Sequence, residues 1–109
     1  MPHLRFRAID AQDVQELSGQ LAEALAEMLN TDVDNFTFEH LPTVFYAKSL
    51  KSEAYPFVEV HWFERPQALQ DEVATKITRT IKALTGAVDV VVVFCKLEKT
   101  AYYENGNHY

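Results

Sequence analysis

Hydrophobic residues follow two different spacings along the chain, and the two spacings alternate. Short stretches in which every second residue is apolar predict half-buried β-strands, and longer stretches with an apolar residue every three or four positions predict helices with one buried face. A continuous apolar run near the end predicts a strand buried on both faces. The expected strands are residues 4–9, 36–39, 57–63 and 89–94, the expected helices 11–29 and 67–85, with a weaker extended segment at 43–47, a loop at 48–55 and an aromatic, polar tail at 95–109.

Residues that favour helix ends and turns stand at these boundaries. Asp10 can supply an N-cap oxygen to the first helix, and Pro66 suits the first turn of the second. Asn30 and Gly86 can end the two helices. In the tail, Asn105 followed by Gly106 predicts a tight turn.

The two halves of the chain superimpose. A shift of 54 residues places 2–8 on 56–62, and shifts of 56 and 55 align the helices and the second strands. We therefore expect one domain over 1–109, made of pseudo-repeats at about 2–47 and 56–101. Two right-handed βαβ units then place two helices on one face of a four-stranded mixed sheet, an α+β fold in two layers. The pattern alone leaves open whether the strands of each unit are interleaved, as in ferredoxin-like folds, or lie side by side.

The start of the chain and its tail favour the side-by-side arrangement. Met1 and Pro2 lead directly into a strand, a second βαβ unit follows, and the chain ends in the aromatic and polar residues 102–109. This combination resembles the tautomerase superfamily, which includes macrophage migration inhibitory factor and the 4-oxalocrotonate tautomerases, and is most similar to a small, uncharacterised bacterial branch of it. The resemblance implies a homotrimer whose sheets surround a central channel, with residues 43–47 and the tail adding to the sheets of neighbouring subunits.

Composition and charge narrow the function classes. The chain has 109 residues and a mass of 12.5 kDa, with 10 basic against 16 acidic residues and a net charge of −6. This charge argues against nonspecific binding to nucleic acid or to anionic membranes. The longest apolar run, Val90 to Cys95, is too short to span a bilayer. Because Cys95 is the single cysteine, the composition fits a reducing compartment, and we expect a cytoplasmic protein.

The resemblance assigns a catalytic role to Pro2. Once Met1 is removed, a terminal proline is a secondary amine, and an apolar environment lowers its pKa so that it can act as a general base. Its electrophilic partner would be Arg65, which lies at the end of the first strand of the second repeat. There Arg65 could hold a substrate carboxylate. The alternatives are that Pro2 only begins a strand and that Arg65 is a solvated cation paired with Glu64.

Other residues whose side chains could bind a ligand or take part in catalysis also have structural interpretations. Tyr102 and Tyr103 could line a substrate pocket at a subunit boundary or simply pack in an interface. The four histidines show no close ligand spacing, so we expect no metal site, and the resemblance implies no cofactor. Cys95 has no basic neighbour in sequence and is interpreted as a small packing residue. A structural charge network is expected on the open face of the sheet, formed by Arg5, Arg7, Glu59 and His61.

Three classes of function are therefore candidates for this chain. The first is a cofactor-independent tautomerase that moves a proton alpha to the carbonyl of a small keto or enol acid. The second is a noncatalytic trimeric protein that kept the fold without the site. The third, an RNA-binding protein of ferredoxin-like fold, requires basic and stacking residues on the open sheet face, and there Glu59 and the negative net charge argue against it.

Overall fold

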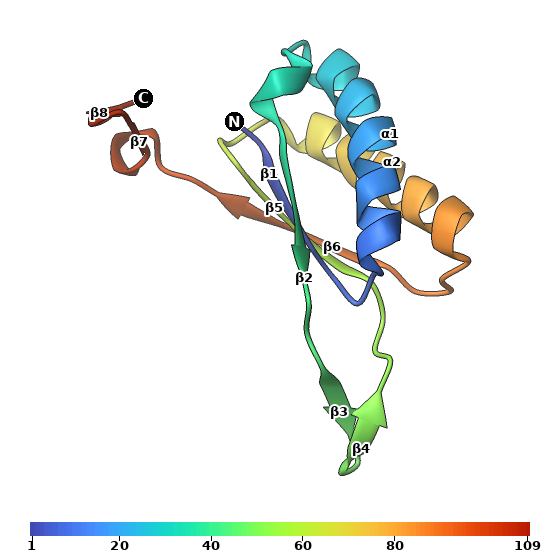
Figure 1. Cartoon of the computed structure of the whole chain (residues 1–109). Helices are drawn as coiled ribbons and strands as arrows, with labels where there is room; N and C mark the ends of the chain where they lie inside the picture. Colours follow the sequence, from blue (N-terminus) through green and yellow to red (C-terminus); the bar gives the residue numbers. More distant parts are fainter.

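The computed structural model describes residues 1–109, and its main helices and strands lie close to the predicted positions (Figure 1). Two short strand pairs and two single-turn 3₁₀ helices complete the chain. In chain order the elements are β1 (His3–Arg7), α1 (Ala11–Leu29), η1 (Val33–Asn35), β2 (Thr37–Leu41), β3 (Phe45–Ala47), β4 (Leu50–Ser52), β5 (Phe57–Trp62), α2 (Gln67–Thr85), β6 (Val91–Lys96), η2 (Lys99–Ala101), β7 (Tyr103–Glu104) and β8 (Asn107–His108).

The main sheet has four strands in the order β2-β1-β5-β6. β1 runs parallel to β2, β5 runs parallel to β6, and the two units meet antiparallel where β1 pairs with β5. The strands of each βαβ unit thus lie side by side. A ferredoxin-like arrangement would place β1 between β5 and β6, so that alternative is wrong, and the predicted α+β fold is confirmed.

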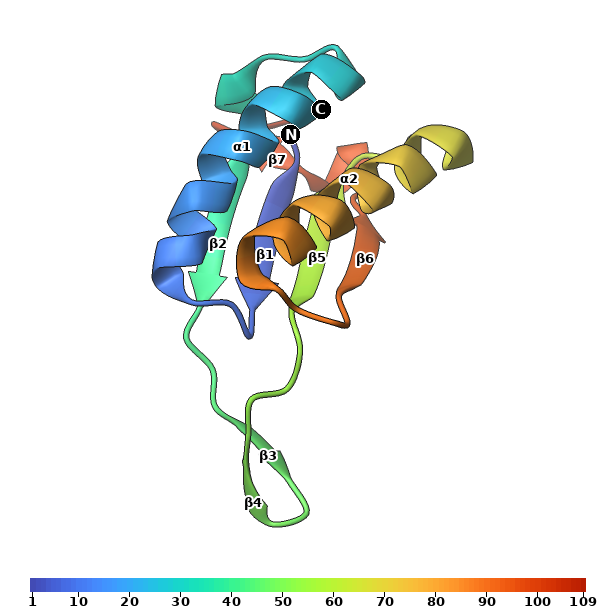
Figure 2. The same ribbon diagram turned by 90° about the vertical axis from the view of Figure 1, so that its right-hand side faces the viewer.

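Both helices cover the same face of the sheet, and the core lies between these two layers (Figure 2). Alternate residues of β1 and β5 meet residues spaced three or four apart on α1 and α2, as the two periodicities require. Full burial of each such aliphatic side chain contributes about 1.5–3 kcal/mol. The most deeply buried core residues are Leu4, Phe6, Leu17, Leu21, Leu25, Val58, Val60, Trp62, Val73, Ile77 and Ile81.

The helix ends follow the sequence signals with two differences. Asn30 and Gly86 end α1 and α2 in the left-handed conformation, with φ of 50° and 73°. Asp10 occupies the N-cap of α1, but its side chain makes no capping hydrogen bond there. Pro66 is the N-cap of α2 rather than a residue of its first turn, so the helix begins at Gln67.

Two glycine-to-alanine substitutions should have opposite effects on stability. Gly86→Ala places a Cβ at a positive φ of 73° and should lower the free energy of unfolding by about 1–2 kcal/mol. Gly19 lies inside α1, and a Cβ there meets no atom within 4 Å, so Gly19→Ala should raise stability by about 0.5–1 kcal/mol. Urea unfolding at one fixed protein concentration measures both. Equal signs for the two variants would contradict this account of the helix ends.

A hairpin arm leaves the body between β2 and β5 (Figure 1). β3 pairs antiparallel with β4, so the prediction of a loop over 48–55 is wrong at Leu50–Ser52. β4 forms because it pairs with β3. Its three residues are too few to show the alternation of apolar and polar positions that predicts a strand. The arm and its base expose large apolar side chains, namely Val44, Tyr46, Leu50 and Tyr55.

The two edges of the main sheet, β2 and β6, have no further strand within the chain. The prediction that the last long strand is buried on both faces is wrong for the single chain, because residues 91–95 of β6 are only half-buried. Beyond β6, the tail forms a second hairpin from β7 and β8. Asn105 and Gly106 turn it with φ of 53° and 85°, which confirms the predicted turn.

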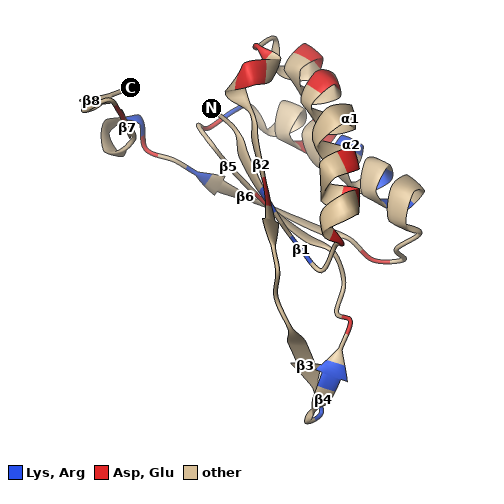
Figure 3. Cartoon of the chain, viewed as in Figure 1, with Lys and Arg blue, Asp and Glu red and all other residues tan.

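Charged residues are unevenly placed on the surface. The charged residues of α1 and η1 are all acidic, whereas α2 and the hairpin arm carry both acidic and basic residues (Figure 3). The outward face of α1 is therefore mainly negative. Neither helix has the length and apolar character that crossing a membrane requires.

Candidate active site

The amino-terminal segment is fixed at one end of the sheet. Pro2 directly precedes β1, and its side chain is fully buried. Its carbonyl accepts a hydrogen bond of 3.1 Å from the Thr37 backbone N–H at the start of β2. Because proline lacks an N–H, its position ahead of β1 leaves no ladder donor unpaired.

Arg65 reaches the same end of the sheet because β5 runs antiparallel to β1. His3 pairs with His61, so the chain that leaves β5 passes beside the amino terminus. Burial, and next the nearby positive charge of Arg65, lower the pKa of the Met1 amino group, while Glu104 partly opposes them. The structure therefore brings Arg65 into the surroundings of the terminal amine, as the sequence analysis expected.

Arg65 is not paired with Glu64. The Glu64 carboxylate instead accepts a hydrogen bond of 3.0 Å from Lys96 Nζ, so the interpretation of a Glu64–Arg65 pair is wrong. The Arg65 guanidinium lies 5.5 Å from the centre of the Trp62 ring, and its Nε is buried without a hydrogen-bond partner. A cation held in this way has no protein carboxylate to neutralise it.

The tail brings aromatic residues to the start of β1. The Tyr102 hydroxyl lies 2.7 Å from His3 Nε2, and the rings of Phe63, Tyr102 and Tyr109 lie 5.1–5.3 Å apart. The Tyr109 hydroxyl donates a hydrogen bond of 2.6 Å to Glu104, and this bond raises the pKa of Tyr109. The tail thus places Tyr102 next to His3 and places Glu104 near the terminal amine.

Tyr103 is not part of this group. Its side chain is 62% exposed, and its ring contacts only that of His108 among the aromatic residues, at 5.8 Å across the β7–β8 hairpin. Neighbouring residues of an extended chain point in opposite directions, so Tyr102 and Tyr103 face different sides of the tail. Within one chain, the structure brings together Pro2, Arg65 and Tyr102 at one end of the sheet but not Tyr103.

The surroundings of His3 favour its neutral form. Its Nδ1 lies 2.6 Å from Thr37 Oγ1, and its Nε2 contacts Tyr102. Burial is the largest cause that lowers the pKa of His3 below 6.5, and the positive charges of the terminal amine and of His61 lower it further. A neutral imidazole is therefore expected beside Pro2 at pH 7.

We expect His3 to titrate below pH 6.5 in the folded protein. Since the unfolded chain then takes up the proton first, His3 adds stability above about pH 6.5 that is lost as the pH falls through its lowered folded pKa. Imidazole signals followed by NMR across a pH series measure the value. His61→Gln removes one of the neighbouring charges and should raise the pKa of His3, yet leave it below 6.5, because burial is the larger cause. A wild-type value at or above 6.5 would contradict this assignment.

The open face of the sheet carries the predicted charge network, with one exception. Arg5 Nε donates a hydrogen bond of 2.9 Å to Glu39, and Arg5 Nη1 lies 3.9 Å from Glu59, whose carboxylate contacts His61 Nε2 at 3.0 Å. Arg7 does not join these residues, and that part of the prediction is wrong. Its guanidinium stacks 4.0 Å from the centre of the Phe57 ring, because the register places Phe57 and not Glu59 opposite it.

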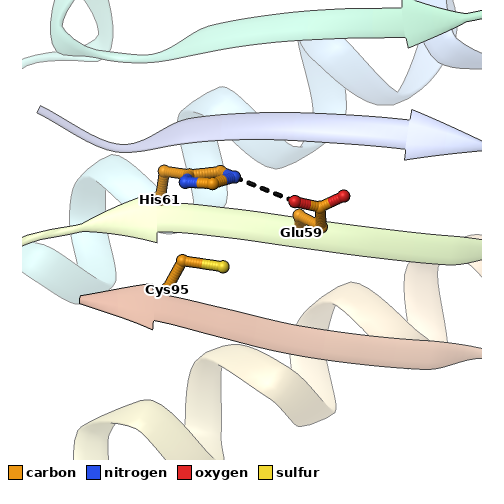
Figure 4. Close-up of side chains that lie close together, drawn as sticks. All are labelled: Glu59, His61 and Cys95. Carbon is orange, nitrogen blue, oxygen red and sulfur yellow. Dashed lines mark hydrogen bonds and ion pairs between the residues drawn. The ribbon is translucent and has the colours of Figure 1, made fainter. Parts of the chain in front are cut away.

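Cys95 lies beside this network, which the sequence analysis missed. The parallel register pairs Cys95 with His61, and the ligand atoms of Glu59, His61 and Cys95 all lie within 4.8 Å of one another (Figure 4). The alternation on β5 already places Glu59 and His61 on one face. The missing information was the register between β5 and β6, because it depends on how the crossover helix packs.

A large hollow in the surface of the chain lies away from Pro2. It measures about 950 Å³ and opens at the other end of the sheet, between the β1–α1 connection, the base of the hairpin arm and the segment after α2. Its polar lining includes Asp10, His40 and Lys51. Neither Pro2 nor Arg65 borders it, so this hollow does not serve the group at the amino terminus.

This sheet order, with both helices on one face and a buried proline ahead of β1, is that of a tautomerase-fold protein. The sequence profile of the family described as a domain of unknown function, DUF1904, matches residues 1–108, and the chain belongs to that family. A DUF1904 protein of known structure from Sebaldella termitidis is 33% identical, with 100% of both chains covered and a TM-score of 0.93. A Vibrio cholerae protein of unknown function is 44% identical over 99% of this chain and 87% of that chain, with a TM-score of 0.90.

More distant structures share the fold alone. A fused 4-OT protein, described as an asymmetric trimer, is 14% identical over 97% of this chain and 94% of that chain, with a TM-score of 0.84. A macrophage migration inhibitory factor-like protein from Entamoeba histolytica is 11% identical over 99% and 98%, with a TM-score of 0.75. No curated protein matches the sequence. These structures confirm the predicted tautomerase fold, and the profile match shows that the chain belongs to a family of unknown function.

Proposed function

We propose that the protein is a cofactor-independent tautomerase that moves a proton alpha to the carbonyl of a small keto or enol acid. After removal of Met1, the Pro2 nitrogen is the general base. Arg65 binds the substrate carboxylate and stabilises the negative charge of the enolate. Tyr102 and, from a neighbouring subunit, Tyr103 line the pocket.

One observation carries this proposal. The positive charge of Arg65 lies close enough to the amino terminus to lower the pKa of the terminal amine, and no protein carboxylate pairs with it. A base that must be neutral at pH 7 and a cation that binds an anion are the two groups that enolisation of a keto acid requires. Pro2 is more deeply buried than Met1, so desolvation should act on its amine as well.

The test is turnover of a panel of small keto and enol acids, phenylenolpyruvate among them, by chain whose intact mass shows that Met1 is absent. Arg65→Ala should raise KM about 10–100-fold, the loss of one charge-assisted contact, and Arg65→Lys should restore part of it. Glu64→Gln, the matched neighbour that faces Lys96, should leave KM unchanged. Complete inertness of the processed chain across the panel would reject the tautomerase proposal.

The proposed active unit is a homotrimer. Both edges of the main sheet are open within one chain, and the hairpin arm exposes Tyr46 and Leu50 at 69% and 71%. Added strands from neighbours would cover such edges. A fused 4-OT protein of the same fold is described as a trimer. In this assembly a neighbouring subunit completes the pocket around Pro2.

Light scattering should return three times the chain mass of 12.5 kDa. Tyr46→Asp puts a charge on the apolar surface of the arm and should shift the protein toward single chains without changing its helix signal in circular dichroism. Lys48→Asp alters the charge at the tip of the same arm but removes no apolar surface, and should leave the mass unchanged. Removal of residues 101–109 should also weaken association more than it weakens the helices. A single-chain mass for the wild type at micromolar concentration would contradict the trimer.

A noncatalytic trimeric protein is the second candidate, and one observation favours it. The Pro2 side chain is fully buried, and the hollow of about 950 Å³ lies at the other end of the sheet. In this second candidate, Pro2 serves only to begin β1. The two candidates differ in whether loss of Met1 creates activity.

We also propose a cytoplasmic location. The chain has one cysteine, Cys95, which is unpaired and half-buried. Such a thiol stays reduced where glutathione and thioredoxin act. Fractionation of the source cells, followed by detection of the protein, tests this location.

A further inference from the structure

The open face of the sheet gathers three different metal-ligating side chains from two neighbouring strands. Glu59 and His61 are alternate residues of β5, and Cys95 on β6 is the register partner of His61. Their ligand atoms lie within 4.8 Å of one another, and all three residues are partly buried (Figure 4). None of the three has a role in the proposed proton transfer.

We propose that Glu59, His61 and Cys95 form a binding site for a divalent cation of the zinc class. A carboxylate oxygen, an imidazole nitrogen and a thiolate sulfur are all zinc ligands, whereas magnesium and calcium avoid thiolate. Three protein ligands leave the fourth tetrahedral position to water or to a small anion. No metal site was expected from the sequence, because the spacing of histidines along the chain does not reveal which residues lie side by side on neighbouring strands.

The distances fit this use. Bond lengths of about 2.0–2.3 Å place neighbouring ligand atoms of a tetrahedral zinc site about 3.3–3.8 Å apart. The ligand atoms already lie within 4.8 Å of one another on paired strands of one sheet, so the proposed site requires side-chain rotations but no change of strand register. β5 is hydrogen-bonded on both sides, to β1 and to β6, so the backbone under Glu59 and His61 is held rigidly.

The neighbouring polar groups leave ligand atoms available. Glu59 Oε1 contacts both His61 Nε2 and the more distant Arg5 guanidinium. Glu59 Oε2 makes no hydrogen bond or ion pair. The closest partner of Arg5 is Glu39, at 2.9 Å, so the positive charge of Arg5 is paired mainly with Glu39 and not with Glu59. His3 lies across from His61, but Thr37 and Tyr102 occupy both of its ring nitrogens, and we do not count it as a ligand.

Cobalt titration of the untagged, metal-free full-length chain tests the site. Because Cys95 is the only cysteine, a thiolate-to-cobalt charge-transfer band in the near ultraviolet can arise only from this residue. We expect such a band, saturating at one ion per chain with micromolar or tighter affinity and bleached by zinc. Cys95→Ser should abolish the band, and His61→Gln and Glu59→Gln should each weaken cobalt binding at least about tenfold. His108→Gln, the matched change on the exposed tail, should leave binding unchanged.

Thiol reactivity of the wild-type chain gives a second readout that needs no variant to fold. Zinc should protect Cys95 from a disulfide reagent, and excess chelator should restore its reaction. Absence of the charge-transfer band, binding only at millimolar cobalt, or equal binding by His61→Gln and His108→Gln would overturn the proposal. A thiol that reacts at the same rate with and without zinc would overturn it as well, and if His61→Gln slowed that reaction, the three residues would form a histidine-activated thiol instead.

Discussion

Chain that retains Met1 is expected to show no tautomerase activity, and removal of Met1 is expected to create it. In the retained form the Pro2 nitrogen is an amide and has no basic lone pair. In the processed form it is a secondary amine in the part of the molecule where burial and the charge of Arg65 already lower the pKa of the terminal amine. Initial rates on an enol acid, with intact mass determined for each sample, measure the difference.

Within the processed form, Pro2→Ala should lower kcat about 10²–10⁴-fold, which is the usual contribution of a positioned general base. Alanine leaves a primary amine with greater conformational freedom. The base is therefore still present but is held less precisely. The rate of the wild type should rise with pH through the neutral region, since an amine with a lowered pKa becomes neutral, and therefore basic, as the pH passes that value. Equal rates for the Met1-retained and processed forms would show that Pro2 is structural.

The helices and the sheet order of this protein were largely predictable from its sequence. Apolar residues at helical spacing placed both helices at their observed bounds, because α1 and α2 each bury one narrow face against the sheet. The choice between two sheet orders came from the resemblance and not from periodicity. Alternation along a strand records which face is buried but carries no information on which strand lies beside it.

The parts that could not be predicted depend on contacts between distant residues. β4 forms because β3 lies opposite it, and Arg7 stacks on Phe57 because the β1–β5 register pairs them. The candidate site at the amino terminus was predictable only in part. Arg65 was expected near Pro2 because antiparallel units bring these two chain ends together, whereas the contact of Tyr102 with His3 depends on how the tail turns back over the sheet.

Trp62→Ala should produce the largest loss of stability of any single core substitution considered. The Trp62 side chain is completely buried in the core, and the centre of its ring lies 4.8 Å from that of Phe94. Replacement by alanine leaves a cavity and should lower the free energy of unfolding by about 3–5 kcal/mol. Urea unfolding at fixed protein concentration measures the loss, and the concentration matters because association adds to apparent stability.

Trp62→Phe is the matched variant, and it should cost less than half as much. Phenylalanine keeps an aromatic face toward Phe94 and removes the indole Nε1–H, which is buried without a hydrogen-bond partner. An unpaired buried donor costs about 1–3 kcal/mol, so its removal offsets part of the lost volume. Equal losses for Trp62→Phe and Trp62→Ala would mean that Nε1 has a partner in solution, such as a bound water or a neighbouring subunit, and that the indole nitrogen stabilises the fold.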